Sequence, residues 1–375
     1  MKPNQILKIY GTDYKEKTKA LLTAAGLAER IPSQDARIAL KPNLVCPSPA
    51  EFGATTHPEV TAGIIEYLQE HGFRQLMILE GSWIGDRTEE SFAICGYKEL
   101  SGKYNVPLVD TQKARSYTAG HEGFAFQLTD VTKEYDFLIN IPVLKGHCQT
   151  RITCALKNLK GLLPNPEKRR FHEKGLHHPI AHLAASVKQD FIVVDHICGD
   201  PDFEEGGRPL ARNCVMAALD PVLVDSYACY LLGYKTEDVP YIGYACNSGV
   251  GSTDLSKAEI LCVKNDSFLR NFEWEPDTEE PFTEHALDVS YAAKDADACS
   301  ACYSSLIGAL QRLEEEGLLQ HLHEKIGIGQ GMQGKTGRLG VGKCTKDFEY
   351  SIPGCPPDEE TVCEHLRKYI MDHSC

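Results

Sequence analysis

The chain has 375 residues, of which 42% are hydrophobic and 25% charged, and its formal net charge at pH 7 is −14. This length exceeds one ordinary hydrophobic core, so we expect a large α/β domain and a smaller module. The negative charge argues against general nucleic-acid binding, and no apolar run is long enough to span a bilayer. Fifteen cysteines without a secretory signal favour a reducing, cytoplasmic location.

Segments typical of strands and helices alternate along the first domain. Apolar runs predict strands at residues 6–10, 37–45, 75–80, 106–110, 136–144, 191–197, 214–219 and 258–263. Amphipathic stretches predict helices at residues 15–31, 56–72, 87–104 and 150–161. This alternation predicts an α/β fold with a mostly parallel, doubly wound sheet. In such sheets a ligand binds beyond the carboxyl ends of the strands. We detect no internal repeat.

Polar and basic residues directly follow several of the predicted strands. We expect Lys41 and Asn43, after the second strand, to bind an anionic ligand. We expect the same of His57 at the start of a helix, where backbone N–H groups favour anions. Lys145 and His147 follow the most apolar strand. We assign these two residues as a catalytic acid/base pair, because imidazole titrates near neutrality.

A second basic stretch follows the candidate catalytic pair. We predict that Lys157, Asn158 and Lys160 anchor the substrate. Residues 133–174 contain nine Lys or Arg residues and four acidic residues, a local excess of +5 in a chain whose net charge is −14. Cations gathered near strand ends focus the electrostatic field on a cleft. The stretch therefore predicts a small anionic substrate, such as a carboxylate or a phosphate.

Purely structural interpretations compete with these assignments. Asn43 follows a proline and fits a turn, and His57 fits a solvent-facing histidine at a helix start. His147 fits a hydrogen-bonded loop residue. The basic stretch itself fits a solvated surface without a ligand.

An acidic segment that contains two prolines divides the chain. Residues 272–285 predict a linker between a domain at 1–271 and a cysteine-bearing module at 286–375. A helix is expected to begin at the second cysteine of that module and to end near residue 316, because apolar residues recur there at helical spacing.

Four cysteines in this module are candidate metal ligands, namely Cys299, Cys302, Cys344 and Cys355. Many glycines lie between them, and glycine lets the backbone adopt positive φ and approach a bulky group closely. Sets of four thiolates hold iron–sulfur clusters or zinc. Only the first two cysteines have the short Cys-x2-Cys spacing of a zinc knuckle. We therefore predict one [4Fe–4S] cluster, with zinc and unligated structural thiols as the alternatives.

The chain resembles known families in two regions. The run Gly-x-Gly-x-Cys followed by Pro-Gly-Cys-Pro-Pro resembles the proximal-cluster segment of hydrogenase small subunits and related respiratory subunits. That resemblance covers about the last 35 residues and implies cluster ligation, not a reaction.

Residues 38–250 resemble the DUF362 family. The motifs that carry this resemblance are Lys-Pro-Asn-Leu-Val at 41–45, Thr-Thr-His-Pro-Glu at 55–59, the strand ending in Lys-Gly-His at 138–147, Leu-Lys-Asn-Leu-Lys-Gly at 156–161, the Asp195 strand and Ala-Ala-Leu-Asp-Pro-Val-Leu-Val-Asp at 217–225. The chain has Gly146 where the family usually has threonine, and His196 where it usually has glycine. The resemblance implies the fold and the place of the site, and members often carry an iron–sulfur module.

Three functions fit these observations. The first is an iron–sulfur oxidoreductase that passes electrons to a small anionic substrate, with a redox protein as donor and a homo-oligomer as a possible assembly. The second is a non-redox enzyme or binding module for a carboxylate or phosphate, with a structural cluster. The third is an electron carrier without a substrate. A dinucleotide-binding fingerprint is absent, since the Gly-x-Gly runs lie only in the tail.

Overall fold

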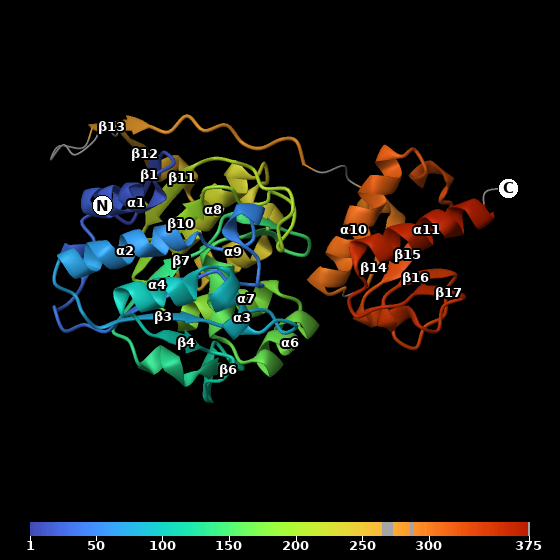
Figure 1. Cartoon of the computed structure of the whole chain (residues 1–375), viewed down its shortest axis with the longest axis horizontal. Coiled ribbons are helices and arrows are strands. Elements are labelled where there is room, and N and C mark those ends of the chain that lie inside the picture. The colour runs from blue at the N-terminus through green and yellow to red at the C-terminus, as the bar shows by residue number, and fades with distance from the viewer. Residues whose placement is uncertain (265–272, 286–288, 297, 374–375) are drawn as a thin grey trace. The chain divides into compact units, whose positions relative to one another are not determined.

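The protein forms two compact units, Met1–Thr283 and Glu284–Cys375. The structure is a computed structural model, and it describes residues 1–264, 273–285, 289–296 and 298–373 (Figure 1). The predicted domain boundary at 271–272 and the predicted module start at 286 lie outside the described residues. Residues 273–276 of the predicted linker form an edge strand of the first unit.

A nine-stranded sheet forms the centre of the first unit. Its strands, in spatial order, are β13 (Glu273–Pro276), β12 (Glu259–Lys264), β1 (Gln5–Tyr10), β11 (Cys214–Ala218), β10 (Phe191–His196), β7 (Phe137–Ile141), β2 (Ile38–Pro42), β3 (Leu76–Glu80) and β4 (Leu108–Asp110). Parallel pairing joins β10, β7, β2, β3 and β4 in turn, and also joins β1 to β12. Strand β11 is antiparallel to both neighbours, and β13 is antiparallel to β12. The predicted α/β class with a mostly parallel sheet is confirmed.

Helices cover both faces of this sheet, because side chains alternate along each strand. In β10, Ile192 and Val194 join one apolar core, whereas Phe191 and Val193 join the other. The second core is closed by α1 (Tyr14–Ala25), α2 (Pro58–Glu70), α3 (Thr88–Ile94) and α4 (Tyr97–Tyr104). The first core is closed by α5 (Ala155–Asn158), α6 (Asn165–Glu173), α7 (His177–Ser186), α8 (Pro221–Leu231) and α9 (Pro240–Asn247).

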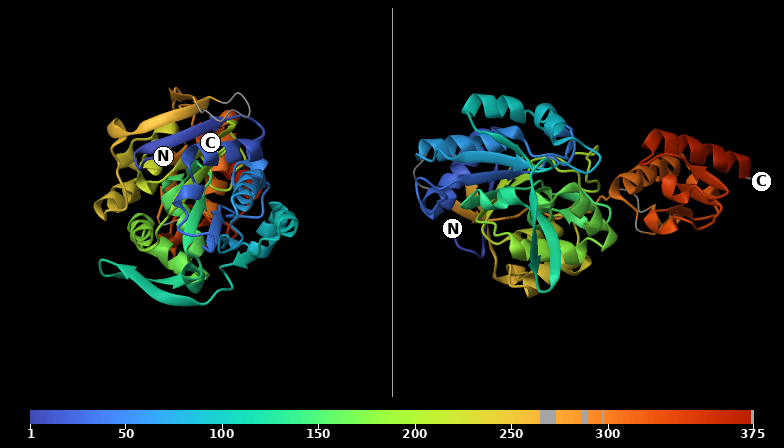
Figure 2. Two further views of the ribbon diagram at one scale, coloured as in Figure 1. Left: turned by 90° about the vertical axis from the view of Figure 1, so that its left-hand side faces the viewer. Right: turned by 90° about the horizontal axis from the view of Figure 1, so that it is seen from below.

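Two predicted helices of the first unit differ in the structure. The helix expected at 87–104 is two helices, because Gly96 adopts φ 77° between them. The helix expected at 150–161 begins instead as β9 (Arg151–Thr153), which pairs with β8 (Lys145–His147), and becomes helical only from Ala155. A further hairpin, β5 (Ser116–His121) and β6 (Phe124–Thr129), extends from the domain (Figure 2). The sequence analysis did not predict this hairpin.

The second unit has a small parallel sheet of its own. Its strands are β14 (Ala293–Asp295), β15 (Ile326–Ile328), β16 (Leu339–Val341) and β17 (Tyr350–Ile352), paired in that order. Helix α10 (Ser300–Glu315) packs against α11 (Glu359–His373) through buried residues such as Leu306 and Leu366. Within the described part of the chain, no helix combines the length and the apolar character needed to cross a membrane.

Candidate functional site

A buried ion pair joins the carboxyl ends of two neighbouring strands. Lys41, near the end of β2, places its Nζ 2.7 Å from Oε2 of Glu80, the last residue of β3. The Lys41 side chain is 0% exposed and that of Glu80 is 3% exposed. Glu80 also accepts hydrogen bonds from the backbone N–H groups of Leu44 and Gly81. The pair is therefore fixed by the ends of both strands.

Two glycines let other segments approach this ion pair closely. A Cβ on Gly161 would lie 1.9 Å from Oε1 of Glu80 and 2.6 Å from Nζ of Lys41. A Cβ on Gly81 would lie 2.2 Å from Oγ1 of Thr111 and 3.0 Å from Nζ of Lys168. Any larger side chain at either position requires its neighbours to move.

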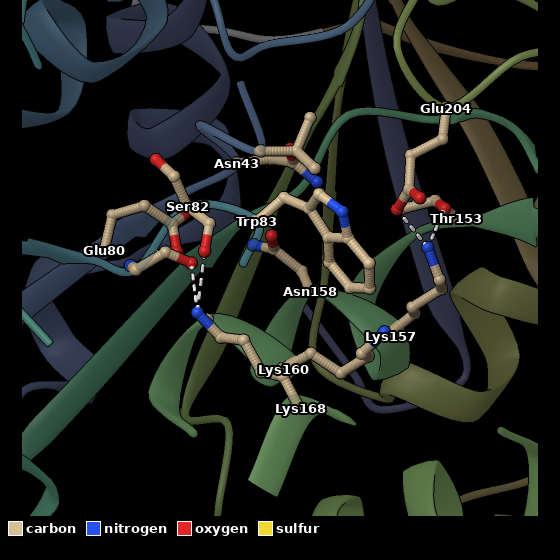
Figure 3. A pocket seen from close by; sticks show the side chains of 13 residues that line it. Asn43, Glu80, Ser82, Trp83, Thr153, Lys157, Asn158, Lys160, Lys168 and Glu204 are labelled. Carbon is tan, nitrogen blue, oxygen red and sulfur yellow. Dashed lines mark hydrogen bonds and ion pairs between the residues drawn. The ribbon is translucent and has the colours of Figure 1, made fainter. Parts of the chain in front are cut away.

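Next to the ion pair lies a polar cavity of about 50 Å³ (Figure 3). Its lining residues are Asn43, Val45, Glu80, Gly81, Ser82, Trp83, Thr153, Lys157, Asn158, Lys160, Gly161, Lys168 and Glu204. Figure 3 shows two sets of contacts on opposite sides of the Trp83 ring. On one side Lys168 donates to the carbonyl oxygens of Gly81 and Ser82, at 2.9 and 2.8 Å. On the other, Lys157 contacts Glu204 and donates to Thr153 Oγ1 at 2.9 Å.

Positive charge exceeds negative charge around this cavity. The lysines at 41, 157, 160 and 168 are buried there together with two carboxylates, Glu80 and the largely buried Glu204. Glu80 pairs with Lys41, and Glu204 pairs with Lys157. Among the residues that the structure describes, no carboxylate lies within ion-pair distance of Lys160 or Lys168. Both ammonium groups are therefore buried without a direct ion-pair partner among the described residues, and Glu80 and Glu204 act on them only from a greater distance.

Burial and neighbouring charges weaken the protonation of these lysines. Burial, together with the charge of Lys157, lowers the pKa of Lys160 to about 7. Burial lowers the pKa of Lys168 to about 8, and the charge of Lys41 adds to this effect. Nζ of Lys160 lies 3.0 Å from Nε2 of His172, whose ring packs edge-on against Trp83. Lys160 can therefore gain or lose a proton near neutral pH.

Two asparagines predicted to bind ligand line the same cavity. Asn158 donates to Oδ1 of Asn140 at 2.7 Å and to the carbonyl oxygen of Lys41 at 3.2 Å. Oδ1 of Asn43 is buried and accepts no hydrogen bond from the described residues. A buried acceptor without a donor is costly, so a protonated ligand or a water at this position would stabilise the site.

The predicted catalytic pair does not line the cavity. Lys145 Nζ is fully buried and donates to the carbonyl oxygens of Ala54 and Glu204, which fastens the loop that carries Glu204. His147 Nε2 lies 2.9 Å from the Glu204 carboxylate, and its Nδ1 accepts from the backbone N–H of Thr150 at 3.1 Å. Burial lowers the pKa of His147 to about 4, so its ring is neutral. Both residues contact Glu204, and through it they support Lys157.

His57 also lies outside the lysine cavity. Its Nδ1 is 2.8 Å from Oδ2 of Asp195, and it lines a separate cavity of about 510 Å³. The structure thus brings together Asn43, Lys157, Asn158 and Lys160 at one cavity, with Lys41 directly behind it. It separates them from His57.

The four candidate metal ligands follow three parallel strands of the second unit. Cys299 and Cys302 lie between β14 and the first turn of α10, Cys344 follows β16, and Cys355 follows β17. The described residues contain no group of three or more His, Cys, Asp or Glu side chains placed to hold a metal ion. The sulfurs are nevertheless neighbours. The hydrogen bond with the Cys299 thiolate, burial and the charges of Cys355 and Cys344 all raise the pKa of Cys302.

A glycine in the left-handed region lies against these thiols. Gly342 adopts φ 87° at the end of β16, and a Cβ built on it would lie 3.6 Å from Sγ of Cys302. The hydrogen bond from Cys302 lowers the pKa of the Cys299 thiol. Thiol ligands at the ends of neighbouring strands therefore fit an iron–sulfur cluster. Among the described residues these sulfurs do not already form a metal-binding group.

Comparison with known proteins identifies the first unit. The family described as "Domain of unknown function (DUF362)" matches residues 38–230, which is just over half of the chain. The chain belongs to the DUF362 family. The match includes every residue that lines the lysine cavity and ends before the second unit begins.

Two individual proteins are similar to this DUF362 protein. A thylakoid-associated protein of Synechocystis sp. is 29% identical over 206 residues, which cover 50% of this chain and 62% of that protein. The lactate racemase apoprotein of Thermoanaerobacterium thermosaccharolyticum aligns at 14% identity and a TM-score of 0.38, over 58% of this chain and 55% of that one. The chain therefore spans less than two thirds of either protein.

Several residues that line the lysine cavity were not assigned an individual role from sequence. Glu80, Lys168, Trp83 and Glu204 all line the cavity. Glu80 ends a predicted strand, and its position was a usable signal. Lys168 lies on α6 and reaches back to β3, and Glu204 lies on a polar loop. The contact of Lys168 with Gly81 and that of Glu204 with Lys157 join distant parts of the chain, so local sequence does not predict them.

Proposed function

We propose that this DUF362 protein is an iron–sulfur oxidoreductase that acts on a small anion. The observation that carries the proposal is the pair of buried lysines, Lys160 and Lys168, that have no carboxylate partner among the described residues. A buried ammonium without a counter-charge is costly. A bound carboxylate or phosphate would offset that cost.

The cavity limits the size of the anion. A volume of about 50 Å³ holds only a few water-sized groups. Trp83 forms one side, and its ring lies 5.3 Å from Nζ of Lys160. A small carboxylate or phosphate group fits this space, with the remainder of a larger substrate directed outwards.

Lys160 is the proposed proton-transfer group. Before an anion binds, its pKa of about 7 lets it exchange a proton near neutral pH, and a bound anion then favours the protonated, proton-donating form. His172 accepts a hydrogen bond from it, and burial keeps that ring neutral by lowering its pKa. Lys160 would hold a proton at Nζ, next to the bound anion, and either donate or recover it.

Cys299, Cys302, Cys344 and Cys355 would hold the [4Fe–4S] cluster. The support is their placement at the ends of parallel strands, together with the positive φ of Gly342, which brings the backbone against Cys302. The cluster, when bound, would supply electrons for the reaction, and a redox protein would be the donor.

Anaerobic purification followed by iron and sulfide analysis tests the cluster. We expect roughly four iron atoms per chain, and an EPR signal that appears on reduction with dithionite. Cys344→Ser and Cys355→Ser should each lose iron, whereas Cys246→Ser, a change at a half-buried thiol of the first unit, should not. Unchanged iron content in the first two variants would show that the ligand assignment is wrong.

A second function is favoured by one specific observation. Every residue that lines the lysine cavity lies in the first unit. A non-redox enzyme or binding module with a structural cluster therefore needs no electron transfer. Calorimetric titration with phosphate and acetate, before and after reduction, separates the two. Anion binding together with a cluster that dithionite does not reduce would favour this second function.

A further inference from the structure

Three side chains outside the lysine cavity have the arrangement of an activated nucleophile. Sγ of Cys198 lies 3.7 Å from Nε2 of His57, and Nδ1 of His57 lies 2.8 Å from Oδ2 of Asp195. The three residues come from two places in the chain: His57 is at the N-cap of α2, and Asp195 and Cys198 lie in and just after β10. A thiol, an imidazole and a carboxylate in this order form the nucleophile–base–orienter set of covalent catalysis.

The carboxylate fixes the orientation of the ring. Oδ2 of Asp195 also accepts the backbone N–H of His57 at 2.7 Å, and Oδ1 accepts the backbone N–H of Ile197 at 3.1 Å. Asp195 is 1% exposed, so its carboxylate is shielded from water, whereas the His57 ring lines the cavity. With Nδ1–H directed at Asp195, Nε2 is the nitrogen that faces the sulfur.

Electrostatics also favour a protonated imidazole. Burial acts to lower the pKa of His57, but the charge of Asp195 and the hydrogen bonds to Asp195 and Cys198 raise it to about 11. A protonated ring beside a sulfur stabilises the thiolate. The Tyr14 ring packs edge-on against His57 and holds it from the other side.

A cavity of ligand size opens onto this set. Its volume of about 510 Å³ lies within the range of small-molecule sites. The titratable groups that line it besides Cys198 and His57 are Tyr14, Glu51, Glu59 and Cys95, and the two glutamates are exposed at its rim. No Lys or Arg is among the lining residues, all of which belong to the described part of the chain. The cavity therefore disfavours anions.

We propose that Cys198, His57 and Asp195 form a second catalytic site, which takes a neutral or cationic ester or thioester. The Cys198 thiolate attacks the carbonyl carbon and forms a new C–S bond, and the bond to the leaving oxygen or sulfur breaks. His57 gives its Nε2 proton to that leaving group. Water then attacks the acyl-cysteine, His57 takes its proton, and the acid and the thiolate are released. No oxidant or reductant is consumed.

The structural alternative is an inert thiol. Cys198 also donates to the carbonyl oxygen of Ala50 at 3.4 Å, and a His–Asp pair can simply connect α2 to β10. In that case Cys198 would react like other half-buried cysteines. Cys246 is the matched comparator, because it is half-buried and has no histidine partner among the described residues.

Site-resolved alkylation of the full-length protein tests activation. Limiting iodoacetamide is added, and mass spectrometry measures the rate at each cysteine. We expect Cys198 to react faster than Cys246, because only Cys198 has an imidazole within contact distance of its sulfur. His57→Gln should lower the Cys198 rate roughly a hundredfold and leave Cys246 unchanged. A Cys198 rate equal to that of Cys246 in the unmodified protein would overturn the proposal, whether or not the variant folds.

A neutral activated ester tests the chemistry. With p-nitrophenyl acetate we expect a burst of nitrophenolate and an acetyl group on Cys198, both lost in Cys198→Ser and retained in Cys246→Ser, a change at a half-buried thiol outside this cavity. Acetylation elsewhere, with none on Cys198, would contradict the assignment. The two cavities share no lining residue, so Lys160→Met should leave this acetylation intact. Loss of anion binding at the lysine cavity and loss of acetylation at Cys198 can therefore be told apart.

Discussion

Lys160 is the residue whose charge a bound anion controls. Without the anion its ammonium is buried, and its pKa falls to about 7. An adjacent negative charge restores the protonated form and raises that pKa again. Anion binding should therefore take up protons between about pH 7 and 9, the range set by the pKa values near 7 and 8 of Lys160 and Lys168.

We predict that phosphate affinity falls as pH rises through this range. Binding is strongest below pH 7, where both lysines are already protonated, and is lost as each is deprotonated. Lys160→Met should reduce phosphate affinity at least about tenfold, which corresponds to about 1.4 kcal/mol. Isothermal titration in buffers of different ionisation enthalpy measures both effects. Lys174→Met, at an exposed lysine nearby, is the control. Equal affinity in the two variants would exclude Lys160 from the anion site.

The Gly161 backbone gives a second prediction at residue scale. A Cβ there would lie 1.9 Å from Glu80, so Gly161→Ala must displace the Lys41–Glu80 ion pair. We expect a loss of about 1–3 kcal/mol in unfolding free energy, typical of overpacking. Gly102→Ala is the control, since nothing lies within 4 Å of that position in α4. Chemical denaturation of both variants checks this, and equal stability would mean that the ion pair relocates freely.

The sequence predicted the part of the lysine cavity that lies at the ends of parallel strands. Lys41 and Asn43 follow a strand, and the carboxyl ends of parallel strands meet at one edge. The same reasoning placed Lys145 and His147 in the site, but there the chain turns into the β8–β9 hairpin and both side chains contact Glu204 instead. Strand ends are visible in sequence. The direction of each side chain depends on a loop some sixty residues away in the chain.

At the scale of elements, one buried lysine fastens an edge segment to the sheet. Lys8 in β1 is 0% exposed, and its Nζ lies 2.8 Å from Asp277 and 2.6 Å from Glu279. Both acids follow β13, in the stretch that the sequence analysis interpreted as a linker. Prolines and acidic residues are typical of linkers, so local sequence favoured that interpretation. The ion pairs with Lys8 join residues that are about 270 positions apart in the sequence, and local sequence does not reveal them.

We predict that Lys8→Met releases this segment. It would leave the largely buried Asp277 without its cation, whereas Glu279 keeps its contacts with His196 and Arg212, and we expect a cost of roughly 3 kcal/mol. Limited proteolysis should then cut within residues 273–283, as read by mass spectrometry. Lys2→Met is the control, because its ion pair with Glu259 spans 3.7 Å at the surface. If both variants resist the protease equally, β13 is held by its backbone pairing alone.

The second unit contains a repeat that the sequence analysis missed. Ile-Gly-Ile-Gly at 326–329 and Leu-Gly-Val-Gly at 339–342 each form a three-residue strand followed by a 3-10 turn. The Phe348 ring packs close to the glycines at 327, 337 and 340, where a Cβ would come within 3.0 Å of it. Strands this short lack a period-two pattern. The many glycines predicted that the backbone approaches a bulky group closely. At three of them the bulky group is the Phe348 ring.

At the scale of the whole molecule, the two units should respond to different ligands. Phosphate binds only the folded first unit in our proposal, so it stabilises that unit by an amount set by its concentration relative to Kd. The cluster ligands lie in the second unit alone. Differential scanning calorimetry of the full-length protein, kept anaerobic, should therefore show two transitions.

The expected pattern is specific. Phosphate at about a hundred times its Kd should add about 2.7 kcal/mol to the first unit and leave the other transition unmoved. Cys355→Ser should lower only the second, because metal binding contributes directly to the folding of small ligating modules. Lys160→Met should abolish the phosphate shift while unfolding at an equal or higher temperature, since it removes a buried, unpaired charge. A single transition that moves with both ligands would mean that the units fold as one, and the anion and thiol sites would then be thermodynamically coupled.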